Sequence, residues 1–524
     1  MRLLTKNLSG FFSRGDDPGG IRSTGINLPL LVFSAVYYSL LIFLAAYLNI
    51  WEDEVYSMNT SSESLKYAFN QSYEFELQPP VYFLLLTIWR TFSASVFWAR
   101  LLSVIAVFLT QLFLYQFIKK ITDQKTATFL VVLFLLNPVI IYAALEIRTF
   151  AFVLFLSVVI IISFYNTYYS DKITFKSRIL FIVLAAAGLF TQYFVGFLLF
   201  ANAVILLAGK KWKTLGSYLT DMIIPLVLLL LFIPKIMAGA GVQSSSFPEY
   251  SRTFKDFVLE IKGMAGLITF GFFLPLDFAD SKVLQKVFKA GILLLLAVSL
   301  YYSDIKKSLR QLFPYLLISL IIFFFFIIVL WLYGRYAVEK KYLLVLFPAL
   351  FMILITFFRS FKPGIQYLWL FIFIMIYLVN DIGKYHELYK VKDFRSLAGF
   401  LEESEKRNEP VFVFRNISAE NLEYYYNGIN EIIPVPDEFS YDEAFGQKQW
   451  ELTEEYMNGL EGCLQNYSEF YLVIDNSPLR GVNESRALLL DFLFQGYSNV
   501  FEQAFRGKLI LYKFSNKEFK LSQL

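Results

Sequence analysis

Long apolar runs separated by short polar segments fill the first 383 residues of the chain. The first run, Leu28–Ile50, is long enough to cross a bilayer core as a helix and follows a polar, mixed-charge leader at 1–27. Because the run is too long for the core of a signal peptide, we interpret it as a retained first span. Further runs predict spans at 96–118, 126–144, 149–166, 178–192, 194–208, 217–235, 285–302, 312–332, 342–358 and 364–381. The pattern therefore predicts an all-α polytopic membrane bundle of about 11 transmembrane helices.

Basic residues in alternate loops predict the orientation of this bundle. Cytoplasmic loops carry an excess of Lys and Arg. With a cytoplasmic N-terminus, the loop bases fall on the cytoplasmic side if the apolar stretches 80–92 and 256–276 do not cross the membrane. We interpret both stretches as helices at the outer membrane face. The bases concerned are Lys119, Lys120, Lys125, Lys172, Lys176, Arg178, Lys210, Lys211, Lys213, Lys306, Lys307, Arg310, Arg359 and Lys362.

The last part of the chain, 384–524, has a different composition. It holds 15 basic and 23 acidic residues, against 32 and 20 in 1–383. Short β-type runs and helical patterns alternate in it, which predicts a small α/β domain. The runs are at 410–414, 471–475 and 508–514, and the helical patterns at 391–406, 418–427 and 484–495. An odd number of spans places this domain outside the cytoplasm. We therefore predict a cytoplasmic leader (1–27), a membrane domain (28–383) with a first external loop at 51–95, and an extracytoplasmic α/β domain (384–524).

Composition narrows the class of protein. Of 524 residues, 57% are apolar and only 17% are charged, which leaves too little charge to cover a soluble surface. This excludes a soluble enzyme, a disordered chain and a nucleic-acid-binding protein. A single cysteine, Cys463, excludes an internal disulfide, and a single histidine, His386, leaves little room for a His-ligated metal. We expect a multi-pass protein of the cell membrane, with the bacterial inner membrane favoured.

Three motifs follow the first span. Three consecutive carboxylates, Glu52–Glu54, directly outside a membrane helix are costly unless they are solvated, paired or used. The segment Leu77–Phe83 contains two prolines, which suit the first turn of a helix. Arg100 and Ser103 then stand at the start of the second span.

This order of motifs resembles the membrane glycosyltransferases of the GT-C fold. The similarity is greatest to the family 39 group, which contains protein O-mannosyltransferases, lipid A aminoarabinose transferases and bacterial polyprenyl-phosphate-sugar transferases. The motif core covers roughly 28–118, and weaker agreement extends to about 350 in 146–148, 191–194 and 335–336. The sequence departs from the group at Gln78, where relatives often have Lys or His, and at Gln192, where relatives often have His.

The resemblance implies transfer of a sugar from a polyprenyl-phosphate-linked donor to a lipid, glycan or protein acceptor at the extracytoplasmic face, with inversion. Such a reaction needs a base for the acceptor and cations for the departing phosphate. We predict Asp53 as general base, Glu54 as an aid to the acceptor, and cations for the phosphate from Arg148, Arg335 and Lys340 or Lys341. The predicted topology brings these residues, with Glu146 and Tyr336, to one membrane face. The resemblance adds further substrate-binding positions: Gln78, Tyr82, Gln192 and Tyr193.

Other interpretations stay open. The acidic triplet could be a solvated helix boundary, Glu146 and Arg148 could neutralise each other, and Lys340 and Lys341 could be interfacial charges. No cofactor is implied with certainty, although a divalent cation at Asp53 and Glu54 is a weaker possibility. The rival functions are a transporter or flippase of lipid-linked sugars and an O-antigen ligase or polymerase. A transporter is expected to carry ionisable residues near mid-membrane in two matching halves, and no repeat is visible here.

Overall fold

The computed structural model describes residues 27–169, 173–246, 253–266, 268, 282–301, 305–333, 340–383, 392–440, 451–476 and 482–516. The chain divides into two compact units. The helical unit comprises 1–46, 61–73 and 77–385, and the sheet unit comprises 47–60, 74–76 and 386–524. Most of the acidic segment after the first helix therefore groups with the C-terminal part of the chain, although the sequence suggested that it belongs with the membrane helices.

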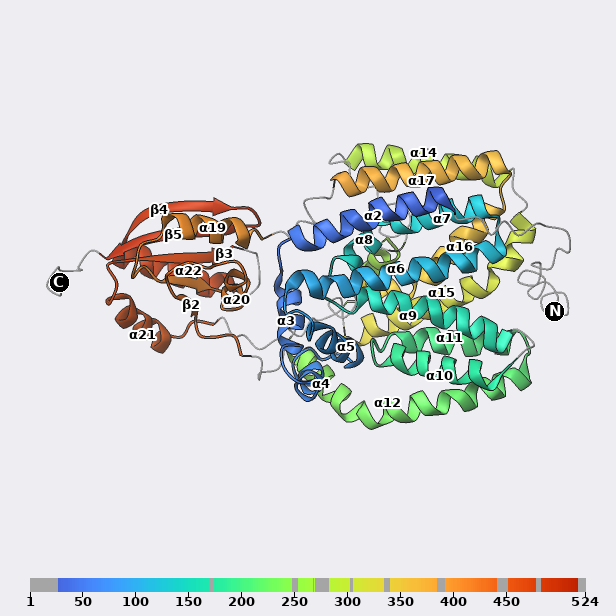
Figure 1. Ribbon diagram of the computed structural model, residues 1–524, viewed down its shortest axis with the longest axis horizontal. Coiled ribbons are helices and arrows are strands. Elements are labelled where there is room, and N and C mark those ends of the chain that lie inside the picture. The colour runs from blue at the N-terminus through green and yellow to red at the C-terminus, as the bar shows by residue number, and fades with distance from the viewer. Residues whose placement is uncertain are drawn as a thin grey trace. The chain divides into compact units, whose positions relative to one another are not determined.

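The helical unit is built from the predicted apolar runs (Figure 1). All the runs that fall on described residues are helical, including 80–92 and the described part of 256–276. The elements are α2 (Leu28–Tyr47), α4 (Leu65–Glu74), α5 (Val81–Arg90), α6 (Val96–Ile121), α7 (Gln124–Leu135), α8 (Pro138–Ala144), α9 (Phe150–Phe164), η1 (Tyr165–Tyr169), α10 (Phe175–Leu189), α11 (Val195–Ala208), α12 (Trp212–Ser246), α13 (Phe254–Gly266), α14 (Lys282–Tyr301), α15 (Ile305–Tyr333), η4 (Lys340–Val345), α16 (Phe347–Arg359) and α17 (Pro363–Gly383).

Not all of these helices are long enough to span a membrane. Among the described residues, five are long and apolar enough, and a sixth candidate is the pair α7 and α8, which bends by 64°. The bend has a local cause, because Pro138 lacks the N–H that would continue α7 and the Asn137 side chain accepts a hydrogen bond from the backbone N–H of Val139. The total of 11 spans stays a prediction. The five helices are Leu28–Tyr47, Val96–Lys120, Phe150–Tyr169, Trp212–Pro234 and Pro363–Ile382.

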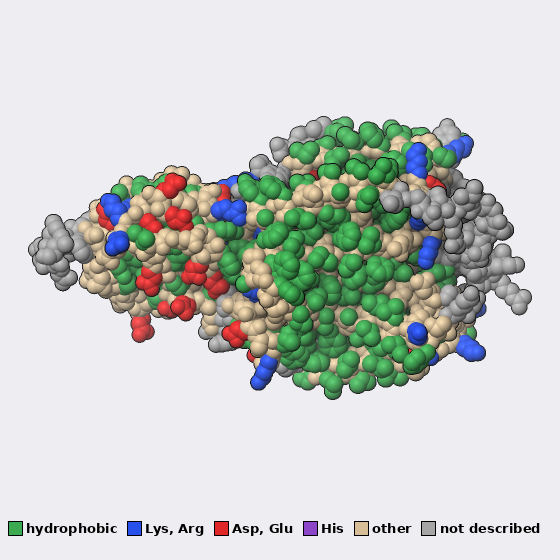
Figure 2. Space-filling view, in the orientation of Figure 1, with side chains coloured by type: hydrophobic (Ala, Val, Ile, Leu, Met, Phe, Trp, Pro, Cys, Tyr) green, Lys and Arg blue, Asp and Glu red, His purple; other side chains and the backbone are tan. Residues whose placement is uncertain are grey.

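The surface of the helical unit is apolar. Figure 2 shows hydrophobic side chains over most of the visible face of its helices. On α2, Val36 and Leu40 are 66% and 54% exposed, whereas Tyr37 and Leu41 are buried against neighbouring helices. A surface of this kind is unfavourable in water and suits contact with lipid chains.

The sheet unit is a five-stranded sheet with helices on both faces. The strand order is β2-β1-β3-β5-β4, in which β1 is parallel to β2 and β3, and β5 is antiparallel to β3 and β4. The elements are α3 (Glu52–Thr60), α19 (Phe394–Ser404), β1 (Val411–Phe414), α20 (Ile417–Glu423), β2 (Ile432–Val435), α21 (Glu454–Leu464), β3 (Glu469–Asp475), α22 (Val482–Gly496), β4 (Tyr497–Phe505) and β5 (Leu509–Asn516). The predicted α/β domain is present, and β2, β4 and α21 are additions to the predicted elements.

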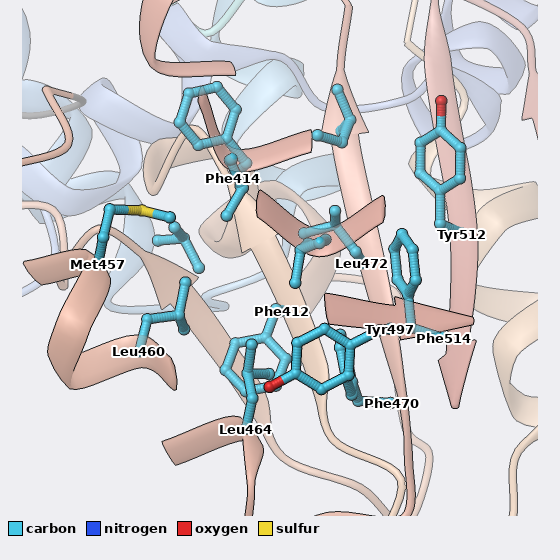
Figure 3. Close-up of a cluster of buried hydrophobic side chains, with 14 of the residues drawn as sticks. Phe412, Phe414, Met457, Leu460, Leu464, Phe470, Leu472, Tyr497, Tyr512 and Phe514 are labelled. Atoms are coloured by element: carbon cyan, nitrogen blue, oxygen red, sulfur yellow. The ribbon is translucent and has the colours of Figure 1, made fainter. Parts of the chain in front are cut away.

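Alternating side chains give the sheet two apolar cores. Phe412 and Phe414 point to the face covered by α21 and α22, where they join Phe470 and Leu472 (Figure 3). Val411 and Val413, together with side chains of β3 and β5, point to the other face, which α19 and α20 cover. This period of two is what strands buried on both faces require. The carboxyl ends of the parallel strands β1 and β3 lie side by side, because Phe414 pairs with Ile474.

Candidate active site

The first residue of the acidic triplet, Glu52, belongs to a network of charged side chains in the sheet unit. The Nη2 atom of Arg415 lies 2.6 Å and 2.8 Å from the two carboxylate oxygens of Glu52. The Nη1 atom of the same guanidinium donates to Asp475 at 3.1 Å. The ammonium group of Lys392 binds Asp475 and lies 4.0 Å from Glu52, so the four side chains form a closed ring. The triplet is therefore not simply a solvated boundary, because its first member is an ion-pair partner.

The central side chains of this network are buried. The side chains of Asp475 and Arg415 are 0% and 6% exposed, and two opposite charges at such depth must be paired. Burial lowers the pKa of Arg415, but the carboxylates of Glu52 and Asp475 outweigh this effect and hold the pKa above its ordinary value. Arg415 also has a φ of 67°, in the left-handed region that costs a non-glycine residue about 1–2 kcal/mol.

The other two members of the triplet lie in the first turn of α3, where negative charge is favoured by the helix dipole. Asp53 is partly exposed and Glu54 is fully buried. The hydroxyl of Tyr56 donates to Glu52 at 2.9 Å, and burial followed by the charge of Glu52 raises the pKa of Tyr56 well above its ordinary value. Among the described residues, no group of three or more His, Cys, Asp and Glu side chains is placed to hold a metal ion. The three carboxylates of the triplet have different surroundings, because Glu52 binds Arg415.

In the helical unit, the proline motif is joined to the turn between α10 and α11. Leu77 has a φ of 53°, the backbone N–H of Gln78 donates to Ser72 at 2.8 Å, and Tyr82 is 1% exposed. The backbone N–H of Val81, in the first turn of α5, donates to the carbonyl of Phe190 at 2.9 Å. The chain entry at Gln78 is thereby fixed beside the turn that begins at Phe190.

That turn carries Gln192 and Tyr193. Gln192 is buried, and burial raises the pKa of Tyr193 above its ordinary value. Burial also raises the pKa of Tyr73 of α4 to about 12, so both phenols stay protonated at neutral pH.

The loop between α8 and α9 carries Glu146 and Arg148, which are 0% and 7% exposed. The Ser103 hydroxyl donates to the backbone carbonyl of Glu146 at 2.5 Å, and the Arg100 guanidinium donates to the carbonyl of Ala45 at 3.0 Å. The Arg-Leu-Leu-Ser motif at the start of α6 thus fixes the end of α2 and the loop of Glu146. In the structure, the Arg100 and Ser103 side chains of this motif bind backbone carbonyl groups.

The short helix η4 completes this cluster. The ammonium of Lys341 lies 5.5 Å from the ring centroid of Phe150, the first residue of α9. The ring of Tyr342 lies 6.3 Å from Phe150 and 5.7 Å from Phe194. Contacts therefore link Val81 with Phe190, and Tyr342 with Phe150 and Phe194, which lie in or next to predicted segments of the helical unit.

The remaining predicted residues stand as follows. Arg335 and Tyr336 lie outside the described residues, and so does His386. Lys340 begins η4, and its side chain lies outside the description. Asp53 and Glu54 belong to the sheet unit, so their meeting with the helical-unit residues stays a prediction.

Sequence reasoning did not identify Arg415, Asp475 or Lys392. A signal was present, because Arg415 directly follows the apolar run of β1 and Asp475 ends the run of β3. Side chains at the carboxyl ends of neighbouring parallel strands meet at one edge of a sheet.

Comparison with known proteins gives one family and several related folds. Residues 77–237 match the family described as dolichyl-phosphate-mannose-protein mannosyltransferase. No curated protein matches the sequence in a direct search. The matched region contains the proline motif, the loop of Glu146 and Arg148, and the turn of Gln192 and Tyr193.

Among solved structures, the fold is similar to that of ArnT from Cupriavidus metallidurans. The apo structure matches with a TM-score of 0.56 at 12% identity, over 93% of this chain and 97% of that chain. The structure of the same protein bound to undecaprenyl phosphate matches with a TM-score of 0.53, also at 12% identity, over 94% and 98%. A weaker likeness, with a TM-score of 0.39 at 12% identity, is to the archaeal oligosaccharyltransferase AglB from Archaeoglobus fulgidus, over 95% of this chain and 75% of that chain.

Proposed function

We propose that this chain, a membrane glycosyltransferase of the GT-C fold, transfers a sugar from a polyprenyl-phosphate-linked donor to an acceptor at the extracytoplasmic face. The family match over 77–237 and the shared fold with ArnT confirm the resemblance inferred from the sequence. The donor class and the face of the membrane go further than these findings. The donor class is supported by the polar cluster of the helical unit and by the undecaprenyl phosphate that the ArnT structure holds, and the face of the membrane by the predicted topology.

One observation carries the proposal. A unit with an apolar surface gathers polar groups from segments far apart in sequence: the buried Glu146 and Arg148 beside α9, the buried Gln192 and half-buried Tyr193 beside α11, and the half-buried Lys341 in η4. Ionisable groups buried in a membrane protein are costly and are kept where they bind substrate or ions. A cationic side chain in such a place suits the phosphate of a lipid-linked sugar, since phosphate is held best by Arg and Lys.

The proposed reaction is a single displacement at the anomeric carbon. The Asp53 carboxylate takes the proton from an acceptor hydroxyl or amine, and the acceptor atom forms a bond to the anomeric carbon. The bond from that carbon to the phosphate oxygen breaks on the opposite face, so the configuration inverts. Lipid phosphate leaves with the electron pair. Glu54 would assist by orienting the acceptor.

Negative charge grows on the leaving phosphate, and fixed cations stabilise it. We assign this task to Arg148, Arg335 and one of Lys340 and Lys341. Glu146, two residues before Arg148, would keep the guanidinium oriented. Gln78, Tyr82, Gln192, Tyr193 and Tyr336 would supply hydrogen bonds to the sugar or the phosphate.

The test is direct. Purified full-length protein in lipid nanodiscs is incubated with a panel of undecaprenyl-phosphate sugars, each carrying mannose, glucose, galactose or aminoarabinose. The acceptor is supplied as an envelope extract. Release of undecaprenyl phosphate with a single donor, dependent on the extract, is the expected result. Release of none from any donor, by protein that binds undecaprenyl phosphate, would contradict the proposal.

A further inference from the structure

The carboxyl edge of the sheet in the sheet unit has the features of a binding site. Strand β1 lies between β2 and β3, and all three are parallel. The helix α20 that follows β1 covers one face, and the helix α22 that follows β3 covers the other. The connections therefore leave β1 and β3 in opposite directions, which makes a topological switch point. Ligands of open α/β sheets bind at such a point, beyond the carboxyl ends of the strands.

The charged side chains at this switch point bind the carboxylate of Glu52. Arg415 directly follows β1, and Asp475 is the last residue of β3. The guanidinium spans the two carboxylates, with Asp475 on one nitrogen and Glu52 on the other. Arg415 adopts its left-handed backbone at this position. The place where a sheet of this topology receives a ligand is thus filled by the side chain of Glu52.

Further contacts hold the segment around Glu52 against the same unit. The backbone N–H of Ile50 donates to the hydroxyl of Tyr425 at 2.6 Å. The Asn49 amide donates to Asp393 at 3.2 Å, and Asp393 also caps α19. Helix α20 packs against α3. The segment is therefore bound by several side chains of the C-terminal part, with Arg415 at its centre.

We propose that Arg415, with Asp475 and Lys392, is a positioning residue that docks Glu52 and thereby sets the orientation of Asp53. Asp53 follows Glu52 in the first turn of α3, so rotation of this turn moves the Asp53 carboxylate. The C-terminal domain is then part of the catalytic machinery without touching substrate. This inference rests on the proposed function for the role of Asp53, while the docking itself is independent of that role.

A second ion network, at the amino ends of the strands, offers a matched control. Lys513 of β5 binds Glu409 at 2.7 Å and Glu469 at 2.9 Å. Glu409 precedes β1 and Glu469 begins β3, so this second buried ion network lies at the amino ends of the same two strands. Lys513→Ala breaks a network of similar burial in the same domain and leaves the docking of Glu52 intact.

The experiment compares four full-length variants in nanodiscs: Arg415→Ala, Arg415→Lys, Glu52→Gln and Lys513→Ala. Hydrogen exchange of the α3 amides measures docking, and turnover of the undecaprenyl-phosphate sugar that the wild type uses measures kcat and KM. We expect Arg415→Ala to speed exchange in 52–60 at least about tenfold and to lower kcat about 10- to 100-fold, because a small misplacement of a reacting group has this effect. The donor KM should stay within about threefold.

The other variants separate positioning from general stability. Arg415→Lys, which keeps a charge but loses the planar donor set, should recover part of both quantities. Glu52→Gln should change both in the same direction as Arg415→Ala and covers the case in which that variant does not fold. Lys513→Ala should lower the unfolding temperature and leave α3 exchange and kcat at wild-type values.

Two results would overturn the inference: wild-type exchange of α3 in both Arg415→Ala and Glu52→Gln, or a fall in kcat no larger than that of Lys513→Ala. Failure of the proposed function has a different signature. Full turnover by Asp53→Asn would contradict the role of Asp53 and, with it, the catalytic part of the inference. The exchange of α3 decides the docking on its own.

Discussion

The Nη2 atom of Arg415 lies 2.6 Å and 2.8 Å from the two carboxylate oxygens of Glu52, although 363 residues separate the two in the chain. This contact explains why 47–60 group with the C-terminal part. It also changes the meaning of the acidic triplet. Glu52 is an ion-pair partner, Glu54 is buried, and Asp53, like Glu52, is partly exposed.

Arg148 should be essential for turnover. If its guanidinium stabilises the leaving phosphate, Arg148→Ala should lower kcat/KM roughly 10²- to 10³-fold, as the loss of one charge-stabilising donor does elsewhere. Arg148→Lys should recover part of the loss. The control is Arg178→Ala, which breaks an ion pair of 2.6 Å with Asp221 between α10 and α12 and should leave turnover near the wild-type rate. Full activity of Arg148→Ala would refute the assignment and favour Lys340 and Lys341.

Gly188 should be intolerant of a side chain. A Cβ atom at this position of α10 would lie 2.9 Å from a methyl carbon of Ile160 in α9 and 2.9 Å from one of Val195 in α11. The β-branched Val195 cannot move easily, so Gly188→Ala should destabilise the protein by about 1–3 kcal/mol and shift the adjacent turn of Gln192. Gly216→Ala in α12 is the control, since nothing lies within 4 Å of its added Cβ atom. Equal unfolding temperatures for the two variants would contradict this packing.

Most helices of the helical unit could be predicted from the sequence because each is an apolar run, whereas α4 is largely polar and no apolar run marks it. The sheet unit was predicted only in part. Strand β4 is mostly exposed and lies at an edge, so no apolar run marks it. Strand β2 is short, lies at the other edge and contains Pro434, which edge strands tolerate. Helix α21 could have been found, because Met457, Leu460 and Leu464 repeat at helical spacing.

The contacts of the candidate site could likewise be predicted only in part. Motif order selected segments of the helical unit, and Val81, Phe194 and Tyr342 make contacts in or next to them, while their role as a site stays a prediction. The partner of Glu52 could not be inferred, because no local pattern relates it to Arg415. Pairing at that separation depends on tertiary structure.

The ion network of Lys513, Glu409 and Glu469, at the amino ends of β1 and β3, should make the free energy of unfolding depend on pH. The interaction with the ammonium group of Lys513 holds the pKa of Glu469 below its ordinary value of 4.5. A carboxyl whose folded pKa is lowered contributes stability above its unfolded pKa and loses it as the pH falls through the folded value. The difference in unfolding temperature between wild type and Glu469→Gln should therefore be greatest above about pH 4.5 and shrink below it. A difference that stays constant down to pH 3 would contradict the assignment.

The predicted topology can be read from thiol accessibility. In a Cys463→Ser background, cysteine at Lys120 or Lys307 should be shielded from an impermeant reagent in intact cells, because both lie in loops predicted to be cytoplasmic. Cysteine at Leu65 or Ser440 should be labelled. Labelling at Lys307 together with protection at Ser440 would overturn the model of 11 spans and make 256–276 a true span.

The central claim is that Asp53 takes the proton of the acceptor. Asp53→Asn keeps the size and hydrogen-bonding shape of the side chain but cannot accept that proton. On one purified sample of this variant, binding of undecaprenyl phosphate and release of undecaprenyl phosphate from the donor sugar are measured beside the wild type. We predict wild-type binding with transfer lost, and a milder loss for Glu54→Gln. Transfer by Asp53→Asn at near the wild-type rate would mean that the acidic segment only anchors α3 and that the proposed mechanism is wrong.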